Sequence, residues 1–136
     1  MQRSMCVAVI MALSGCATTP IPAEEADPVP IARLLAYQEA LVDGATLIVT
    51  RDRGFTGSAC NTVFFINGKP AAEIGAGERA TFQVLPDKRN IIGVSGAGAC
   101  STGLKEREVS IGIGDVARYR ISIDATMSMD LSPTAF

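Results

Sequence analysis

The sequence contains no histidine and no tryptophan, and aromatic residues make up only 5% of its 136 residues. Without histidine, the chain lacks the side chain that most often serves as a general base near neutral pH and as a metal ligand. It also lacks an excess of basic side chains, because 12 Lys and Arg stand against 14 Asp and Glu, a formal net charge of −2. This balance excludes the class of strongly basic nucleic-acid binders.

The common catalytic and cofactor motifs are also missing. No serine or cysteine can be paired with a histidine base, and the glycine-rich segment 95–103 matches neither the P-loop nor the dinucleotide-binding spacing. Carboxylates could in principle act in pairs, but the candidates fall on different predicted strands: Asp52, Glu73, Glu78 and Asp124. We therefore predict a protein that is not an enzyme and that holds no metal and no cofactor.

What is present begins with an export signal. Arg3 and the amino terminus precede about nine apolar residues, 5–13. A transmembrane helix needs roughly 20 apolar residues, whereas a run of this size is typical of the core of a signal peptide.

The segment Leu13-Ser14-Gly15-Cys16 resembles the lipobox of bacterial lipoproteins. That resemblance implies cleavage between Gly15 and Cys16 and acylation of Cys16 on its sulfur and on its amino group. Ala17 at the next position is similar to the pattern that sorts lipoproteins to the outer membrane of Gram-negative bacteria. Two or more acyl chains hold a protein stably on a membrane.

The composition divides the chain into three parts. We assign residues 1–15 to the signal peptide, residues 16–30 to the lipidated cysteine and a tether, and residues 31–136 to a single domain. Residues 17–30 hold four of the seven prolines, so we expect a solvated, extended tether that could reach about 40 Å. Residues 31–41 predict either a short helix or a helical turn that runs into an extended arm.

Short runs of alternating apolar and polar residues dominate the chain from Ala45 onward, which indicates β-strands. The predicted strands are 45–50, 60–66, 69–74, 79–84, 90–94, 106–113, 117–124 and 126–131. The inward residues of four of them are Ala80, Phe82, Val84, Val109, Ile111, Ile113, Tyr119, Ile121, Ile123, Met127, Met129 and Leu131. Asn67-Gly68 predicts a type I′ hairpin turn, and Pro70 places the strand that follows at a sheet edge or makes it begin late.

These strands predict an all-β fold, a small antiparallel β-sandwich of about seven or eight strands, similar to immunoglobulin or transthyretin domains. A small closed β-barrel is the alternative architecture.

Two cysteines remain once Cys6 has left with the signal peptide and Cys16 has been acylated. Cys60 and Cys100 would close a loop of about 40 residues, and in an exported protein such a pair predicts a structural disulfide. A redox-active pair would require the C-x-x-C spacing, which these residues do not have.

The most distinctive polar segment of the domain is the run from Arg51 to Ser58, in which Arg51, Asp52, Arg53 and Phe55 are the candidate binding residues. A charged strand end followed by an aromatic residue between glycines could form a loop that faces a partner. The interpretation we favour is a solvated turn with Phe55 tucked under its edge.

Several short motifs accompany the lipobox: Leu34-Leu35-Ala36-Tyr37-Gln38, Val49-Thr50-Arg51-Asp52-Arg53-Gly54-Phe55, Phe65-Ile66-Asn67-Gly68-Lys69 and Gly77-Glu78-Arg79-Ala80-Thr81-Phe82. Together they make the chain similar to a family of uncharacterised small proteobacterial lipoproteins. Some members carry the label 3-isopropylmalate dehydratase, a large cytoplasmic enzyme with a [4Fe–4S] cluster on cysteine thiolates. An exported chain with one small domain and two remaining cysteines does not fit that label.

We therefore expect an outer-membrane lipoprotein that faces the periplasm and acts as a non-enzymatic binding or structural module. Its acyl chains on Cys16 would contact the membrane, and its partner would be another envelope protein or a cell-wall component. The alternative is an accessory lipoprotein of a secretion or assembly machine, or an inhibitor of a periplasmic enzyme.

Overall fold

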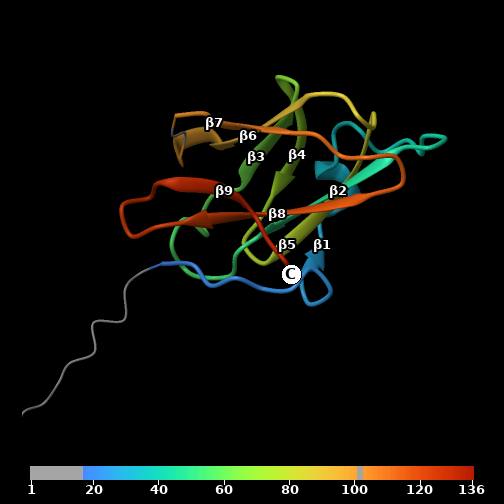
Figure 1. The fold of residues 1–136 in the computed structure, drawn as a ribbon. Coiled ribbons are helices and arrows are strands. Elements are labelled where there is room, and N and C mark those ends of the chain that lie inside the picture. The colour runs from blue at the N-terminus through green and yellow to red at the C-terminus, as the bar shows by residue number, and fades with distance from the viewer. Residues whose placement is uncertain (1–16, 101–102) are drawn as a thin grey trace, which may run out of the picture.

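A computed structural model describes residues 17–100 and 103–136, which form two β-sheets packed face to face (Figure 1). Gly15 and Cys16 lie outside the described residues, so signal cleavage and acylation stay predictions. The five-stranded sheet has the order β1 (Asp27–Pro28), β5 (Glu78–Val84), β2 (Ala45–Arg51), β8 (Val116–Ile123), β9 (Met129–Pro133). The four-stranded sheet has the order β4 (Lys69–Ile74), β3 (Thr62–Ile66), β6 (Asn90–Gly96), β7 (Lys105–Val109).

The all-β sandwich predicted from the sequence is confirmed, and the sheets do not close into the alternative barrel. Within the described residues there are nine strands rather than seven or eight. The additional strand is β1, which lies in the segment for which the sequence predicts a solvated tether.

Two strand pairs run parallel, so the expectation of a purely antiparallel sandwich is wrong for them. β1 pairs with β5 in parallel, and β2 pairs with β8 in parallel, with Leu47 opposite Ala117 and Val49 opposite Tyr119. The other sheet neighbours are antiparallel. Residue alternation shows which face of a strand is apolar but carries no information about the direction of its neighbour.

The core lies between the two sheets, where apolar side chains at every second position meet. Phe64 of β3 and Phe82 of β5 stack across the interface with ring centroids 5.2 Å apart. The side chains around them are also fully buried: Leu47, Val49, Ile66, Ile74, Val84, Ile92, Val94, Ile121 and Ile123. Burial of such side chains is the main contribution to the stability of the sandwich.

The predicted hairpin between β3 and β4 is confirmed. Asn67 and Gly68 have φ angles of 51° and 76°, as a type I′ turn requires. Pro70 lies in β4, an edge strand of its sheet, where a residue without an N–H group can be accommodated.

Two predicted strands are shorter than expected, and one inward residue in each is exposed. β7 ends at Val109 and β9 begins at Met129, which leaves Ile113 and Met127 outside the core. Before β9, the Asp124 carboxylate accepts hydrogen bonds from the backbone N–H groups of Thr126 and Ser128. Such a side-chain-to-backbone turn competes with strand pairing.

Residues 31–41 follow the second of the two predicted alternatives, a helical turn that runs into an extended arm. The short 3₁₀ turn η1 (Ile31–Arg33) is followed by residues that bond to both sheets. The Leu35 N–H donates to the Ala71 carbonyl of β4 at 2.9 Å, and the Tyr37 carbonyl accepts from the Gln83 N–H of β5 at 2.8 Å. The arm therefore covers two sheet edges that would otherwise be open to pairing with another chain.

The solvated tether predicted for residues 17–30 is wrong, because this segment packs on the sandwich. Four of its five apolar residues, Ile21, Ala23, Ala26 and Val29, are buried. The backbone N–H groups of Asp27 and Val29 donate to the carbonyls of Gly77 and Arg79. The edge of β5 thus supplies hydrogen bonds that a sequence rich in proline cannot supply for itself.

Candidate functional site

The segment that the sequence singled out, residues 51–58, begins with a buried cation. Arg51 is the last residue of β2 and only 1% exposed. Its Nη1 donates to the carbonyls of Cys60 and Ile74 at 2.8 and 3.0 Å, and its Nη2 donates to the Gly57 carbonyl at 2.7 Å. Burial lowers the pKa of the guanidinium, which nevertheless stays protonated because arginine loses its proton only at very high pH. Arg51 therefore fastens the loop that follows β2 onto β4.

Asp52 is buried as well, and its carboxylate is held from two sides. Arg120 of β8 donates from Nε to Oδ1 at 3.1 Å and from Nη2 to Oδ2 at 2.6 Å. The Thr18 hydroxyl lies 3.2 Å from Oδ2, and its oxygen accepts the Ile123 N–H at 3.0 Å. The hydrogen bond to Asp52 raises the pKa of Arg120. This fork-on-fork pairing is the strong geometry for an arginine and a carboxylate.

The four candidate binding residues therefore have two different roles. Arg51 and Asp52 are buried in structural contacts and cannot face a partner, so the partner-facing interpretation does not hold for them. Arg53 is exposed, and its backbone pairs with that of Thr19. Phe55 is 94% exposed, which makes the favoured interpretation, in which it is tucked under the loop edge, wrong.

A sequence signal for the burial of Arg51 existed. Arg51 follows Leu47 and Val49 in the same period of two, so it occupies an inward position of β2. No such pattern pointed to the contact between Thr18 and Asp52, because the two residues are 34 positions apart.

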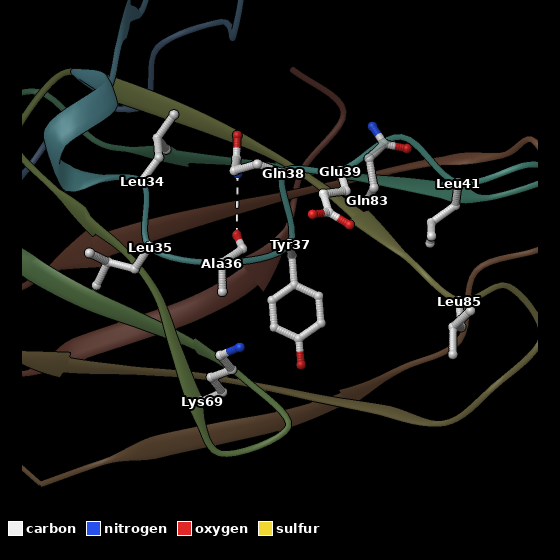
Figure 2. Close-up of a pocket in the computed structure, with 10 residues that line it drawn as sticks. All are labelled: Leu34, Leu35, Ala36, Tyr37, Gln38, Glu39, Leu41, Lys69, Gln83 and Leu85. Atoms are coloured by element: carbon white, nitrogen blue, oxygen red, sulfur yellow. Dashed lines mark hydrogen bonds between the residues drawn. The ribbon is translucent and has the colours of Figure 1, made fainter.

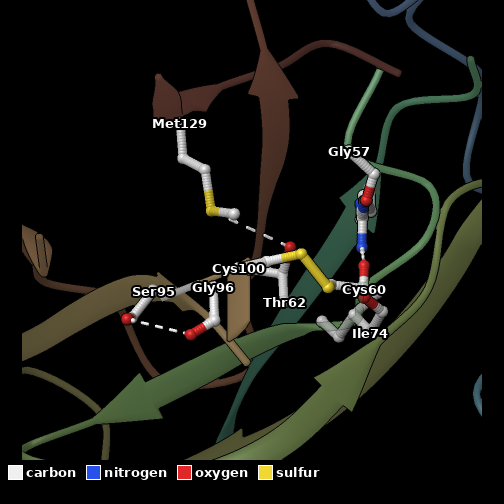
Figure 3. Close-up of a disulfide and its surroundings, with 9 residues drawn as sticks. Gly57, Cys60, Thr62, Ile74, Ser95, Gly96, Cys100 and Met129 are labelled. Atoms are coloured by element: carbon white, nitrogen blue, oxygen red, sulfur yellow. Dashed lines mark hydrogen bonds between the residues drawn. A yellow bond between two sulfur atoms is a disulfide. The ribbon is translucent and has the colours of Figure 1, made fainter. Parts of the chain in front are cut away.

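The predicted disulfide between Cys60 and Cys100 is confirmed, with Cα atoms 6.1 Å apart (Figure 3). It joins the loop before β3 to the short 3₁₀ turn η2 (Gly98–Cys100). A Cβ atom added at Gly96 would overlap the Cys100 carbonyl oxygen, so only glycine allows this close return of the chain. In the disulfide, neither sulfur is available as a thiolate ligand.

At the other end of β2, the arm and the neighbouring sheet edges form an open groove of about 670 Å³ (Figure 2). Leucine side chains and the Tyr37 ring supply its apolar surface, and Tyr37 Oη donates to the Ile66 carbonyl at 3.2 Å. The lining residues are Leu34, Leu35, Ala36, Tyr37, Gln38, Glu39, Leu41, Lys69, Gln83 and Leu85. The sequence had not indicated this groove, since its walls come from three separate segments.

The helical turn that leads into the arm is fixed by an ion pair. Arg33 donates from Nη1 and Nη2 to the two carboxylate oxygens of Glu78 at 2.8 and 2.7 Å, and the Gly75 N–H donates to Glu78 Oε2 at 2.6 Å. Burial raises the pKa of Glu78, but the hydrogen bonds from Arg33 and Gly75 and the charges of Arg33 and Arg51 outweigh it, so the pKa is lowered overall.

Two of the candidate carboxylates are paired with arginine side chains. Asp52 is committed to Arg120, and Glu78 to Arg33. Across residues 17–100 and 103–136, no three His, Cys, Asp or Glu side chains are grouped so as to hold a metal ion. In the same part of the chain, no helix has the length and apolar character needed to cross a bilayer.

No family model matches this chain, and no curated protein does so either. The resemblance to small proteobacterial lipoproteins therefore stays a prediction.

Proposed function

We propose that this protein is an envelope lipoprotein, cleaved after Gly15 and acylated on Cys16, whose sandwich is a non-enzymatic binding module on the periplasmic side of the outer membrane. The observation that carries the anchor is the lipobox-like segment Leu13-Ser14-Gly15-Cys16, and the hydrogen bond between Thr18 and buried Asp52 supports its coupling to the sandwich. Thr18 follows Cys16 by two residues, so an acyl anchor at Cys16 is coupled to β2 and β8 with almost no intervening chain. Such coupling holds the module in one orientation on the membrane.

The groove beside the arm is the surface that we assign to the partner. It is open rather than enclosed, so it fits an extended segment of another envelope protein better than a small molecule, which binding sites usually bury almost completely. Leu35, Leu41 and Leu85 expose apolar area there, whereas Glu39 and Lys69 place one charge of each sign at its border. We therefore expect a partner segment with apolar side chains and little net charge.

The membrane anchor is tested by fractionation of the full chain expressed in a Gram-negative host. We expect the wild-type protein in the membrane fraction after a high-salt wash, with the mass of a cleaved, acylated chain. Cys16→Ser should leave the membrane fraction and lose the added mass. A Cys16→Ser protein that stays membrane-bound, or a wild-type protein of unmodified mass, would contradict the proposed anchor.

The groove is tested by co-purification from detergent-solubilised envelopes. Leu35 is half-exposed and lines the groove, while Ile31 is 87% exposed on η1 and does not line it. Leu35→Glu should reduce recovery of the partner, and Ile31→Glu should leave it unchanged. Equal recovery with both variants would exclude the groove as the binding surface.

A further inference from the structure

We propose that the loop 54–60 lies against the lipid headgroups beside the acyl anchor and inserts the Phe55 side chain into the membrane interface. This inference rests on the proposed acylation of Cys16. It adds a second, non-covalent contact between the protein and the same bilayer.

The loop and the start of the described chain are neighbours. Thr19 and Arg53 form an antiparallel bridge, with N–H to carbonyl distances of 2.7 and 2.9 Å in the two directions. A Cβ atom at Gly54 would lie 3.2 Å from the Thr18 Cα. Figure 1 shows the N-terminal segment running beside the loop that follows β2.

This pairing sets how far the anchor can be from Phe55. Successive Cα atoms are about 3.8 Å apart, so the Cα of Cys16 cannot be more than about 8 Å from that of Thr18. In the antiparallel direction, each step toward the N-terminus moves along the loop toward Phe55. Acyl chains on Cys16 would therefore enter the bilayer close to the Phe55 side chain.

The chemistry of the loop suits a lipid interface. Phe55 is 94% exposed, and residues 54–60 include no charged side chain. Insertion of this loop alone would therefore remove no charge from water, which is the costly part of such a contact; the exposed Arg53 before it can stay among the headgroups. Aromatic side chains are favoured at the level of the headgroups.

The loop is also braced, so the exposure of Phe55 is built into the fold. Arg51 holds the carbonyls of Gly57 and Cys60, and Cys60 is bonded to Cys100. The Ser58 N–H donates to the Phe55 carbonyl at 3.0 Å. A side chain presented on a fixed backbone gives up little conformational freedom on insertion.

The absence of tryptophan from the chain makes the test direct. Phe55→Trp and Val42→Trp each create a single tryptophan at an exposed site. Val42 serves as the control because it is 96% exposed and lies just before β2, at the opposite end of that strand from Phe55. Each acylated variant is reconstituted into phosphatidylethanolamine–phosphatidylglycerol vesicles, with and without bromine on the acyl chains. Tryptophan emission is then compared with that of the detergent-purified protein.

We expect the emission of the Phe55→Trp variant to shift to shorter wavelength in vesicles and to lose intensity with brominated lipid. The Val42→Trp variant should show neither change. Phe55→Trp combined with Cys16→Ser should show no shift, because one aromatic side chain without the anchor binds too weakly.

The outcomes separate the loop contact from the anchor. If the acylated, vesicle-bound Phe55→Trp protein behaves like Val42→Trp, the loop contact is overturned and the anchor stays intact. If the tryptophan of Phe55→Trp is shielded only in native envelopes, the loop belongs to a protein partner and the lipid contact is also overturned. An unmodified mass would instead overturn the proposed acylation.

Discussion

At the scale of single residues, two partly buried ion pairs hold the N-terminal part of the chain to the sandwich. Arg120 and Asp52 fix Thr18, and Arg33 and Glu78 fix the turn before the arm. Both pairs are two-pronged and at least partly shielded from water, so they contribute more than the exposed pairs on the surface.

Asp52→Asn should lower the free energy of unfolding by about 2 kcal/mol, because the Arg120 guanidinium loses its charged partner and the buried amide cannot accept on both atoms. Urea unfolding of the purified domain measures the change. The matched control is Glu108→Gln, which removes an exposed pair with Arg89 and should change stability by less than about 0.5 kcal/mol. Equal effects of the two substitutions would show that the pair of Asp52 with Arg120 contributes no more to stability than an exposed ion pair.

Glu78 should make the free energy of unfolding depend on pH in the acidic range. Its folded-state pKa is lowered, so its contribution is fully present above the ordinary value of about 4.3 and is lost as the pH falls through the lower folded value. Glu78→Gln should therefore flatten the decline of urea midpoints between about pH 5 and pH 3. Glu24→Gln, at an exposed position, serves as the control and should retain the wild-type slope. A wild-type slope in Glu78→Gln would contradict the assignment.

At the scale of elements, the structure depends on how loops are held at the end of the sandwich that carries Phe55. The disulfide, the Arg51 guanidinium and the close approach of Gly96 to Cys100 all act on the loops at this end. A side chain at position 96 would collide with the backbone of Cys100, which explains the glycine there.

Gly96→Ala should destabilise the fold by about 2–3 kcal/mol, because its Cβ overlaps the Cys100 carbonyl and the backbone must move. Gly103→Ala is the matched control in the same segment, since an added Cβ there meets no atom within 4 Å. Thermal unfolding compares the two variants. Tolerance of alanine at both positions would mean that the loop does not need its close approach to β6.

Removal of the cross-link by the double substitution Cys60→Ala and Cys100→Ala should cost about 4 kcal/mol on the chain-entropy model for a 40-residue loop. Urea unfolding of the oxidised wild type and of the double variant measures this difference. A loss below about 1 kcal/mol would contradict this estimate and would show that residual structure already restricts the unfolded chain without the cross-link.

At the scale of the whole molecule, residues 17–30 belong to the folded body. A chain that begins at Ile31 should lose at least about 3 kcal/mol of stability relative to one that begins at Ala17, because Ile21 and Val29 leave the core. Urea unfolding of the two chains tests this. Identical midpoints would contradict the packing of residues 17–30 and support a solvated tether instead. Retention of the 17–30 contacts is also what the proposed orientation on the membrane requires.

The sequence by itself indicated eight of the nine strands in the described residues, because an apolar residue at every second position must face a core whatever its neighbours are. It also determined the hairpin at Asn67-Gly68 and the pairing of Cys60 with Cys100. Only the tertiary structure decided the parallel pairing of β2 with β8, the groove, and the place of Thr18 beside Asp52. These features depend on segments far apart in the chain, and local patterns of polarity do not encode which distant segments meet.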